Sequence, residues 1–409
     1  MKKLLTVLLC LTMLLSTVPA MGEDALTLDL WTIFTGDDGA TLQKLVDEFN
    51  ASHEGITVNH SPMAAADLYT KLPLAVQTAA NIPDLCIIHV ERLPRLIDEG
   101  YLTSGEFLFE NGVRRENYRD WVLDLTNFGG VQYGIPWDFF SGVVYVNPGL
   151  VEKYGLASFV EDGYLTFDEV LEVGAIVEAT GDAVKTINYY GGAFGFLGRY
   201  AELGGDFVGE DGGFDLDTDA FVRMFEKMRE INERGYAIGQ NDDAKTMFIG
   251  NELIFWEVGT HTTPALVSAG VDFYQIPLTC FAPETAVLRF GSHTFAIPED
   301  EERTLEEEAA IAQFIDWMGA NSMPWSTEAG QLAQYQGILE SEAFKALPQA
   351  WLIGDEATAH AQIFNIYYWD LLETAIGQMG KDPIYNPDIN LEDYAQTFRQ
   401  GILDAIAQQ

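Results

Sequence analysis

Basic side chains are scarce in this sequence. Its 409 residues hold 22 Lys and Arg against 63 Asp and Glu, which gives a formal net charge of −41 at pH 7. A surface of this sign repels nucleic acid and anionic membranes, so we expect neither as a partner. Strongly anionic ligands are disfavoured for the same reason, unless a local basic pocket receives them.

Cysteine and histidine are also few, with three and six residues respectively. No Cys-x-x-Cys occurs and no metal-binding His spacing is found, so neither a metal ion nor another cofactor is expected. The Ser-His-Asp signature and the nucleophile elbow are missing too, which argues against an enzyme. Cys86 and Cys280 both lie in β-like runs. We expect two buried thiols, while the sequence leaves a disulfide between them open.

Long apolar runs are absent outside the N-terminus. There, MKK, the apolar core LLTVLLCLTMLL and the small-residue end STVPA follow the order of a secretory signal peptide, which we place at residues 1–22. The apolar core is too short to favour a membrane span. Cys10 follows Leu8 and Leu9, whereas a lipoprotein signal has small residues before its cysteine. The sequence therefore predicts export to a periplasm or to the cell surface, without a lipid anchor.

Strand and helix patterns alternate over the first hundred residues. Strands are predicted over 25–34, 56–62 and 83–90, and helices over 37–53, 67–80 and 91–100. The run PDLCIIHV is almost wholly apolar after its first two residues, which is typical of a parallel strand buried on both faces. This order predicts an α/β layer around a parallel sheet.

The later part of the chain contains both kinds of element. Thr166 and Glu169 form a capping-box pattern at the start of a predicted helix over 166–180. Another helix is predicted over 218–235, with Thr218 or Asp219 as its N-cap. Further helices are predicted over 305–320, 363–380 and 391–409, and further strands over 252–259, 272–278 and 293–298. No low-complexity linker interrupts the chain, so two lobes, if present, must be joined along strands.

One short stretch, YGIPWDFFSGVVYVNPG at residues 133–149, places Trp137, Asp138, Phe139 and Phe140 in a row before a β-branched run. Such a cluster has two interpretations. The four side chains either line a cleft that a ligand enters, or fill the junction between two parts of the fold.

Four phrases in chain order carry a resemblance to a known family. They are NIPDLCIIHVERLPRLIDEGYL, YGIPWDFFSGVVYVNPGLVEKYGL, FIGNELIFWEVGTHTTPAL and MPWSTEAGQLAQYQGILESEAF. Together they resemble the extracellular solute-binding proteins that deliver sugars to ABC importers, the group typified by maltodextrin-binding protein. Two details depart from that family: YVNPG stands where Tyr-Asn-Lys is usual, and His261 stands near a usual Trp.

The resemblance implies an α/β fold of the two-lobed periplasmic-binding-protein kind (type II-like), with discontinuous lobes, a hinge and a ligand cleft between the lobes. The N-terminal lobe would comprise residues 23–137 and 278–319, and the C-terminal lobe residues 138–277 and 320–409. The chain would cross between the lobes near residues 136–141, 276–284 and 318–325. Ligand binding would close the hinge.

A sugar-binding cleft needs flat rings and acceptor oxygens. The apolar face of a sugar stacks on aromatic side chains, and its hydroxyl groups pair with carboxylates, amides and guanidinium groups. Such residues at the carboxyl ends of strands are favoured as ligand contacts. The predicted ligand-binding residues are Trp137, Asp138, Phe139, Phe140, Asp37, His89, Glu91, Arg92, Tyr190, Phe194, Gly259, Thr260, His261 and Trp369.

Some of these candidates also have purely structural interpretations. Asp37 follows a strand and would also serve as the N-cap of the next helix. Glu91 and Arg92 resemble the family's polar clamp, but they would also form an ordinary ion pair at a helix start. Trp369 matches a stacking position of the family, and at helical spacing it would equally belong to a core.

The predicted function is capture of a carbohydrate, most simply an oligosaccharide, and its delivery to the permease subunits of an ABC transporter. The protein would act as a monomer, without catalytic residues and without a cofactor. Two alternatives remain open at this point. Tyr189 and Tyr190 resemble the phenolate pair of periplasmic ferric-ion carriers, and the many carboxylates are compatible with a secreted glycoside hydrolase. A sensory role in place of transport is also open.

Overall fold

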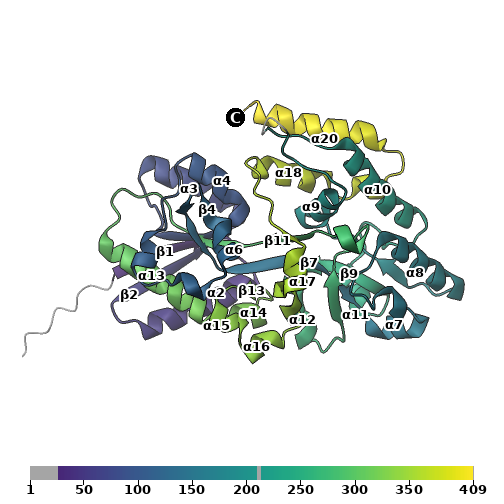
Figure 1. The fold of residues 1–409 in the computed structure, drawn as a ribbon, viewed down its shortest axis with the longest axis horizontal. Helices are drawn as coiled ribbons and strands as arrows, with labels where there is room; N and C mark the ends of the chain where they lie inside the picture. The colour runs from purple at the N-terminus through teal and green to yellow at the C-terminus, as the bar shows by residue number, and fades with distance from the viewer. Residues whose placement is uncertain (1–25, 210–212, 409) are drawn as a thin grey trace, which may run out of the picture.

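The computed structural model describes residues 26–209 and 213–408, so the expected signal peptide at 1–22 lies outside the described residues. Two lobes, each built around its own sheet, lie side by side (Figure 1). The predicted two-lobed α/β fold is confirmed. In the described residues no helix is both long enough and apolar enough to cross a bilayer.

The first sheet has the strand order β2-β1-β3-β12-β6. β1 runs parallel to β2 and β3, whereas β12 is antiparallel to β3 and to β6. The strands are β1 (Leu26–Thr32), β2 (Ile56–Pro62), β3 (Leu85–His89), β6 (Gly134–Pro136) and β12 (His293–Ala296). The predicted run of alternating strands and helices therefore forms a mostly parallel sheet that a late antiparallel strand extends.

Both faces of this sheet are buried, as the apolar run in β3 predicts. Leu85 and Ile87 pack on one face in a cluster with α2 (Asp37–Ser52) and α13 (Leu305–Ala320). Cys86 and Ile88 point to the other face, where α3 (Ala65–Thr78) and α4 (Leu93–Asp98) cover them. Because side chains alternate along a strand, an apolar residue at every position requires cover on both sides.

The second sheet has the order β14-β11-β7-β9-β8, with β10 and β13 also paired to β7. Its long central strand β7 is antiparallel to β9, β10, β11 and β13. The strands are β7 (Asp138–Val146), β8 (Lys185–Ile187), β9 (Leu253–Gly259), β10 (Tyr274–Pro277), β11 (Leu288–Gly291), β13 (Leu332–Ala333) and β14 (Ala361–Gln362). β7 therefore connects most strands of the second sheet, and it begins at the boundary with the first lobe.

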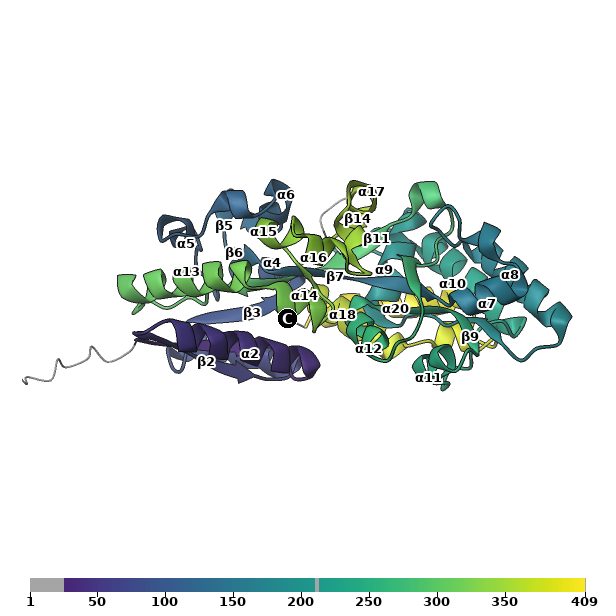
Figure 2. The ribbon, with the colours of Figure 1, turned by 90° about the horizontal axis from the view of Figure 1, so that it is seen from below.

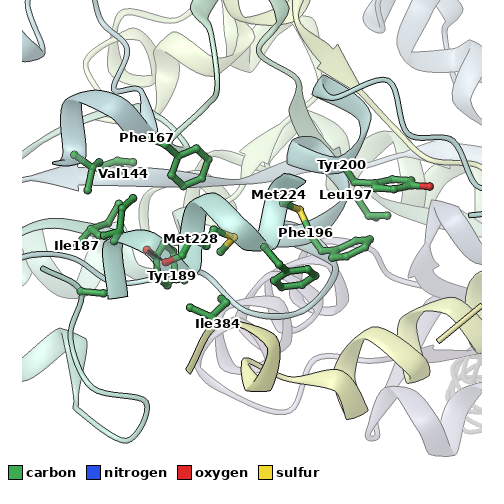
Figure 3. Packing of buried hydrophobic residues seen from close by; sticks show 14 of the residues in the cluster. Val144, Phe167, Ile187, Tyr189, Phe196, Leu197, Tyr200, Met224, Met228 and Ile384 are labelled. Carbon is green, nitrogen blue, oxygen red and sulfur yellow. Dashed lines mark hydrogen bonds between the residues drawn. The ribbon is translucent and has the colours of Figure 1, made fainter. Parts of the chain in front are cut away.

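Helices pack around the second sheet over a large aromatic and aliphatic core (Figure 3). They are α7 (Pro148–Tyr154), α8 (Phe167–Thr180), α9 (Gly192–Glu202), α10 (Thr218–Glu233), α18 (Trp369–Met379) and α20 (Leu391–Ile406). Tyr189 belongs to this core, and its hydroxyl donates to the carbonyl of Met228 at 2.8 Å. Two further helices, α11 (Ala244–Ile249) and α12 (Thr263–Ser268), pack in a separate cluster through Phe248 and Leu266.

Shorter elements complete the fold between these helices and strands. They are α5 (Phe107–Glu110), α6 (Asp120–Leu123), β4 (Asn127–Phe128), β5 (Val131–Gln132), α14 (Met323–Thr327), α15 (Gln336–Leu339), α16 (Glu342–Lys345), α17 (Asp355–Ala359) and α19 (Asp382–Tyr385), with short 3-10 turns between some of them. In the view of Figure 2, α14, α12 and α18 lie between the first-lobe helices α2 and α13 and the second-lobe helices α7, α8 and α10.

The chain passes between the sheets at three places. The first passage is at Trp137, between β6 and β7, within the predicted range of 136–141. The second is at Ser292, between β11 and β12, and not at 276–284 as predicted. The third lies between α14 and β13, at residues 328–331, a few positions after the predicted 318–325.

These passages bear on the predicted lobe boundaries. The prediction assigned residues 278–319 to the N-terminal lobe, but Leu288–Gly291 forms β11 and pairs with β7 in the second sheet. The sequence offers no break at this point, because the chain continues from one short apolar strand directly into the next. The predicted division at 320 falls too early, because Trp325 and Ala329 still pack in the core of the first lobe. The division at 138 lies next to the first passage at Trp137.

Local signals predict some helix starts better than others. The capping box of Thr166 and Glu169 is present at α8. The N-cap of α10 is Asp217, whose carboxylate accepts from the amide of Ala220, so the prediction of Thr218 or Asp219 is wrong by one residue or more. The two buried thiols are confirmed: Cys86 and Cys280 are both free and buried, and burial raises the pKa of each thiol above its ordinary value.

Candidate functional site

A cavity of about 590 Å³ lies between the two lobes. Residues from both sheets contribute to its walls, so the predicted interlobe cleft is present. It is lined by Ile33, Phe34, Asp37, Asp38, Ala65, His89, Phe140, Tyr190, Phe194, His261, Pro264, Ala265, His293, Glu328, Ala329 and Gln331. A second hollow of about 450 Å³ lies between α18 and α20 and belongs to the second lobe alone.

A continuous row of rings forms one wall of the cavity. Phe34, two residues after β1, meets the imidazole of His293 edge-on at 4.7 Å between ring centroids. His293 stacks on Phe140 at 4.5 Å. Phe140 then contacts Phe194 at 5.3 Å, and Phe194 stacks on Tyr190 at 5.8 Å. Because the row begins in the first lobe and ends in the second, a flat ligand lying along it would touch both lobes.

The strand geometry fixes Tyr190 at this wall. Gly142 of β7 faces Gly259 of β9 across the ladder. A Cβ on Gly142 would lie 2.9 Å from a ring carbon of Tyr190, and one on Gly259 would lie 3.0 Å from its hydroxyl. The two glycines therefore leave the slot in which the phenol ring lies. The amide of Tyr190 also donates to Glu257 Oε2 at 2.9 Å.

Glu257 is itself held in place in the second lobe. Its carboxylate forms a buried ion pair with Arg199 of α9. Arg199 Nε also donates to the carbonyl of Thr279 at 3.1 Å. Since a buried charge is tolerated only when it is paired and hydrogen-bonded, this pair gives the chain segment before α9 a fixed position behind the cavity.

Acidic side chains also line the cavity. Asp37 and Asp38 form the first turn of α2, where the partial positive charge of the helix N-terminus favours carboxylates. Asp38 Oδ1 accepts from the amides of Gly36 and Gly39 at 3.2 and 2.7 Å. Glu328 reaches the cavity from the segment after α14 and pairs with Lys44 at 2.9 Å.

Three of the six histidines line the cavity. His89 Nδ1 lies 2.8 Å from the hydroxyl of Tyr69, and burial together with the neighbouring His293 and two arginines holds the pKa of its imidazole well below the ordinary value. His261 retains access to solvent, yet desolvation by the surrounding protein also lowers its imidazole pKa, against an opposing contribution from Asp38 across the cavity. The lowered pKa favours the neutral form of both imidazoles, which can donate and accept hydrogen bonds.

Six of the predicted residues lie together at this cavity. They are Asp37, His89, Phe140, Tyr190, Phe194 and His261. The structural interpretation of Asp37 does not apply, because Gly36 occupies the N-cap of α2 and Asp37 lies within the helix. Phe140, Tyr190, Phe194 and His89 are each half-buried, which leaves part of every ring facing the cavity.

Three residues of the stretch at 133–149 do not line the cavity, which corrects their predicted position. Trp137 is 2% exposed and stacks on Trp325 at 4.3 Å in the core of the first lobe. Asp138 is fully buried and accepts hydrogen bonds from the His293 amide and from Trp325 Nε1. Phe139 is buried against Trp121 and Phe290. These three side chains fill the lobe junction, the alternative that the sequence left open.

Four further candidates contact the protein behind the cavity. Glu91, 2% exposed, pairs with Arg289 of β11 across the lobe boundary at 2.5 Å. Arg92 pairs with Asp370 and Glu373 of α18, so the clamp residues bind the other lobe. Trp369 is 3% exposed, and its ring lies 5.4 Å from the Arg289 guanidinium. Thr260, also predicted, is fully buried, and its hydroxyl has no partner among the described residues.

Gly259 affects the cavity because it has no side chain. A Cβ there would lie 2.5 Å from His261 Nδ1 as well as close to Tyr190. The residue therefore sets the positions of two cavity side chains without lining the cavity itself, which corrects its predicted role as a direct contact.

Sequence reasoning missed several lining residues. Phe34 is the last residue of the predicted strand 25–34, so the rule that ligands bind at the carboxyl ends of strands would have found it. His293 is the first residue of the predicted strand 293–298, and that rule does not apply to it. Asp38 neighbours a candidate that was chosen. Glu328, Ala329 and Gln331 carry no local signal, because they reach the cavity only where the chain passes between the sheets for the third time.

The lining of the cavity suits recognition of a polar ligand that is uncharged or positively charged. Its walls combine flat rings with carboxylate and amide oxygens. Within the described residues, no group of three or more His, Cys, Asp or Glu is arranged to hold a metal ion. The tyrosine pair also fails to act as a pair, because Tyr190 faces the cavity while the Tyr189 hydroxyl is bonded in the core.

Comparison with known sequences agrees with this geometry. The family described as "Bacterial extracellular solute-binding protein" matches residues 35–323. The arabinooligosaccharide-binding protein of Halalkalibacterium halodurans is 26% identical over 171 residues, which is 40% of this chain. The match spans only about a third of that relative's length (36%).

Solved structures share the fold over nearly the whole chain. The GacH receptor of Streptomyces glaucescens has a TM-score of 0.74 at 16% identity, covering 94% of this chain and 98% of its own. UgpB from Mycobacterium tuberculosis, in complex with glycerophosphocholine, has a TM-score of 0.74 at 19% identity, covering 93% of this chain and 99% of its own. The cyclic α-maltosyl-1,6-maltose binding protein of Arthrobacter globiformis reaches 0.71 at 16%, covering 94% and 100% respectively. At these identities the likeness shows the fold.

Proposed function

Because the chain belongs to the bacterial extracellular solute-binding protein family, we propose that it captures a carbohydrate outside the cytoplasm and delivers it unaltered to the permease of an ABC transporter. An oligosaccharide is the expected size of guest. The observation that carries the proposal is the cavity of about 590 Å³ shared by both lobes, whose lining combines a continuous row of rings with acceptor oxygens.

A sugar has apolar C–H surfaces and polar hydroxyl groups, and the cavity offers partners for both. The C–H face of a pyranose stacks on aromatic rings. The cavity offers three such rings side by side, those of Phe140, Phe194 and Tyr190. The hydroxyl groups bond to carboxylate and amide oxygens, which Asp37, Asp38 and Gln331 supply. A ligand that contacts both lobes favours their closed arrangement. That closed arrangement would be the form presented to the transporter.

Further parts of the proposal concern the context of the protein. Residues 1–22 would direct export and then be removed. The protein would act as a monomer, would bind no nucleic acid and would catalyse no reaction. The arabinooligosaccharide-binding relative supports pentose oligomers, and the cyclic α-maltosyl-1,6-maltose binding protein supports hexose oligomers, as the first ligands to screen. A thermal-shift screen against mono- and oligosaccharides tests the proposal, and release of reducing sugar from an oligosaccharide would instead favour a hydrolase.

Phe140→Leu is the first variant to test against the best ligand of that screen. Leucine keeps most of the volume beside His293 but has no flat face, so we expect the dissociation constant to rise by up to about tenfold. Isothermal titration calorimetry measures the change. Phe109→Leu is the matched control, because Phe109 is also half-buried but stacks under Arg115 far from the cavity. Equal affinity in both variants would remove Phe140 from the proposed site.

Gly142→Ala tests the slot that holds Tyr190. The new methyl group would lie 2.9 Å from both the Tyr190 ring and Leu278 Cδ1, so the phenol must move from the wall. We expect ligand affinity to fall by about tenfold or more, with the fold retained. Gly377→Ala is the control, since a Cβ on that helical glycine meets nothing within 4 Å. Unchanged affinity in Gly142→Ala would show that Tyr190 is not a ligand contact.

A further inference from the structure

The charges that line the interlobe cavity are of one sign. Asp37, Asp38 and Glu328 are acidic, and among its described lining residues there is no Lys or Arg. Lys44 pairs with Glu328, but its side chain is 51% exposed and does not line the cavity. A neutral sugar needs no such excess of negative charge, because hydroxyl groups both donate and accept hydrogen bonds.

Asp37 is the carboxylate most available to a ligand. It lies in the first turn of α2, and within the described chain its carboxylate has neither a hydrogen bond nor an ion pair. Its neighbour Asp38 uses only Oδ1 for the amides of Gly36 and Gly39, which leaves Oδ2 without a bond. Three carboxylate oxygens at this end of the cavity therefore remain without a donor.

Gln331 gives a second and independent indication. Its side chain lines the cavity, the residue is only 6% exposed, and its Oε1 has no hydrogen-bond partner among the described residues. A buried acceptor without a partner is costly, so a bound guest that donates to it would remove that cost. The side-chain donors that line the cavity include the Tyr190 hydroxyl, the His89 and His261 imidazoles and the Gln331 amide nitrogen, and none of them is a Lys or Arg.

We propose, resting on the carbohydrate function above, that the guest is a basic saccharide whose protonated amine lies among Asp37, Asp38 and Gln331. An ammonium group brings three N–H donors and no acceptor, which complements a wall of acceptors. Its charge is also favoured by the unpaired Asp37 carboxylate and by the nearby aromatic faces. The sugar rings then lie along Phe140 and Phe194. The negative charge of the cavity also excludes sugars that carry carboxylate or phosphate groups.

Matched sugar series test this proposal directly. Each series holds the neutral sugar, its 2-amino form, its N-acetylated 2-amino form and its uronic acid, for glucose, for galactose and for their short oligomers. Calorimetry is done at a mildly acidic pH that keeps the amine protonated and the carboxylates ionised. For at least one series we expect the amine form to bind about tenfold or more tightly than the neutral sugar. N-acetylation should remove this advantage, the uronic acid should not bind, and added salt should reduce the advantage.

Two variants locate the charge. Asp37→Asn and Asp38→Asn each keep an oxygen of the same shape, so the second variant retains the acceptor for the Gly36 and Gly39 amides while losing the charge. Both should lose most of the amine preference. Neutral sugars should bind each variant somewhat more weakly than the unaltered protein, because their hydroxyl groups also bond to these oxygens, but this loss should be smaller than that of the amine forms. Glu54→Gln is the control: it changes the net charge equally, and Glu54 is exposed and outside the cavity.

The outcomes separate this inference from the function on which it rests. If neutral sugars bind and the amines bind no more tightly, or if the preference persists in both aspartate variants, the inference is overturned and the carbohydrate function stands. If no sugar of any series binds and no pentose oligomer of the thermal-shift screen binds, the carbohydrate function itself is overturned.

Discussion

Glu91→Ala is expected to lower the free energy of unfolding by about 3–5 kcal/mol, because it leaves a buried arginine without its counter-ion. Glu91 and Arg289 are 2% and 4% exposed, and the guanidinium Nη2 lies 2.5 Å from the carboxylate Oε1. Arg289 Nε and Nη1 have no other partner among the described residues. Urea denaturation followed by tryptophan fluorescence measures the change.

The same variant should disturb the cavity. Glu91 follows β3 of the first lobe and Arg289 belongs to β11 of the second, so their ion pair joins the lobes behind the ring wall. The guanidinium also lies 3.7 Å from the centroid of Phe194, one of the lining rings. An arginine that moves toward solvent would take away the support of Phe194, and ligand affinity should fall together with stability.

Two controls test whether burial of the pair is the cause. Glu342→Ala breaks the exposed pair with Lys345 and should change the free energy of unfolding by about 0.5 kcal/mol or less. The double variant Glu91→Leu with Arg289→Met replaces both charges by apolar side chains and should recover most of the lost stability. A loss below about 1 kcal/mol in Glu91→Ala would contradict the assignment of a buried ion pair.

The sequence predicts those parts of the fold that depend on local order. The apolar run at Leu85–Ile88 gave a strand buried on both faces, because alternation sends Leu85 and Cys86 to opposite sides. The Thr166 and Glu169 capping box gave the start of α8, because its four atoms lie within one turn. The family resemblance supplied the two lobes, which no local pattern encodes.

The candidate site was only partly predictable, for two physical reasons. Composition does not tell which way a ring points: Phe139 and Phe140 are adjacent in β7, yet one is buried and the other faces the cavity. Strand alternation would have separated these two residues. The other reason is sequence distance. Glu91 and Arg289 are 198 residues apart, and nothing in the sequence around either residue indicates the other.

Asp138→Ala should produce a loss of similar size, because one buried carboxylate connects all three passages of the chain between the lobes. Asp138 lies at the first passage. At the second passage, its carboxylate accepts a hydrogen bond from the His293 amide at 2.8 Å and lies 2.8 Å from His293 Nδ1. Just before the third passage, Trp325 Nε1 donates a hydrogen bond to the same carboxylate at 2.7 Å. Alanine leaves these donors buried without an acceptor, at about 1–3 kcal/mol each. We expect the free energy of unfolding to fall by about 4 kcal/mol, measured by urea denaturation.

Asparagine and a double variant distinguish this network from simple packing. Asp138→Asn keeps one acceptor oxygen but turns an NH2 group toward a donor, so its loss should be smaller than that of alanine. Trp325→Phe removes the indole donor and keeps a ring against Trp137. Because the two residues share one hydrogen bond, Asp138→Ala with Trp325→Phe should cost less than the sum of the single variants. Strict additivity would mean that the bond between the first and third passages contributes nothing to holding the lobes together.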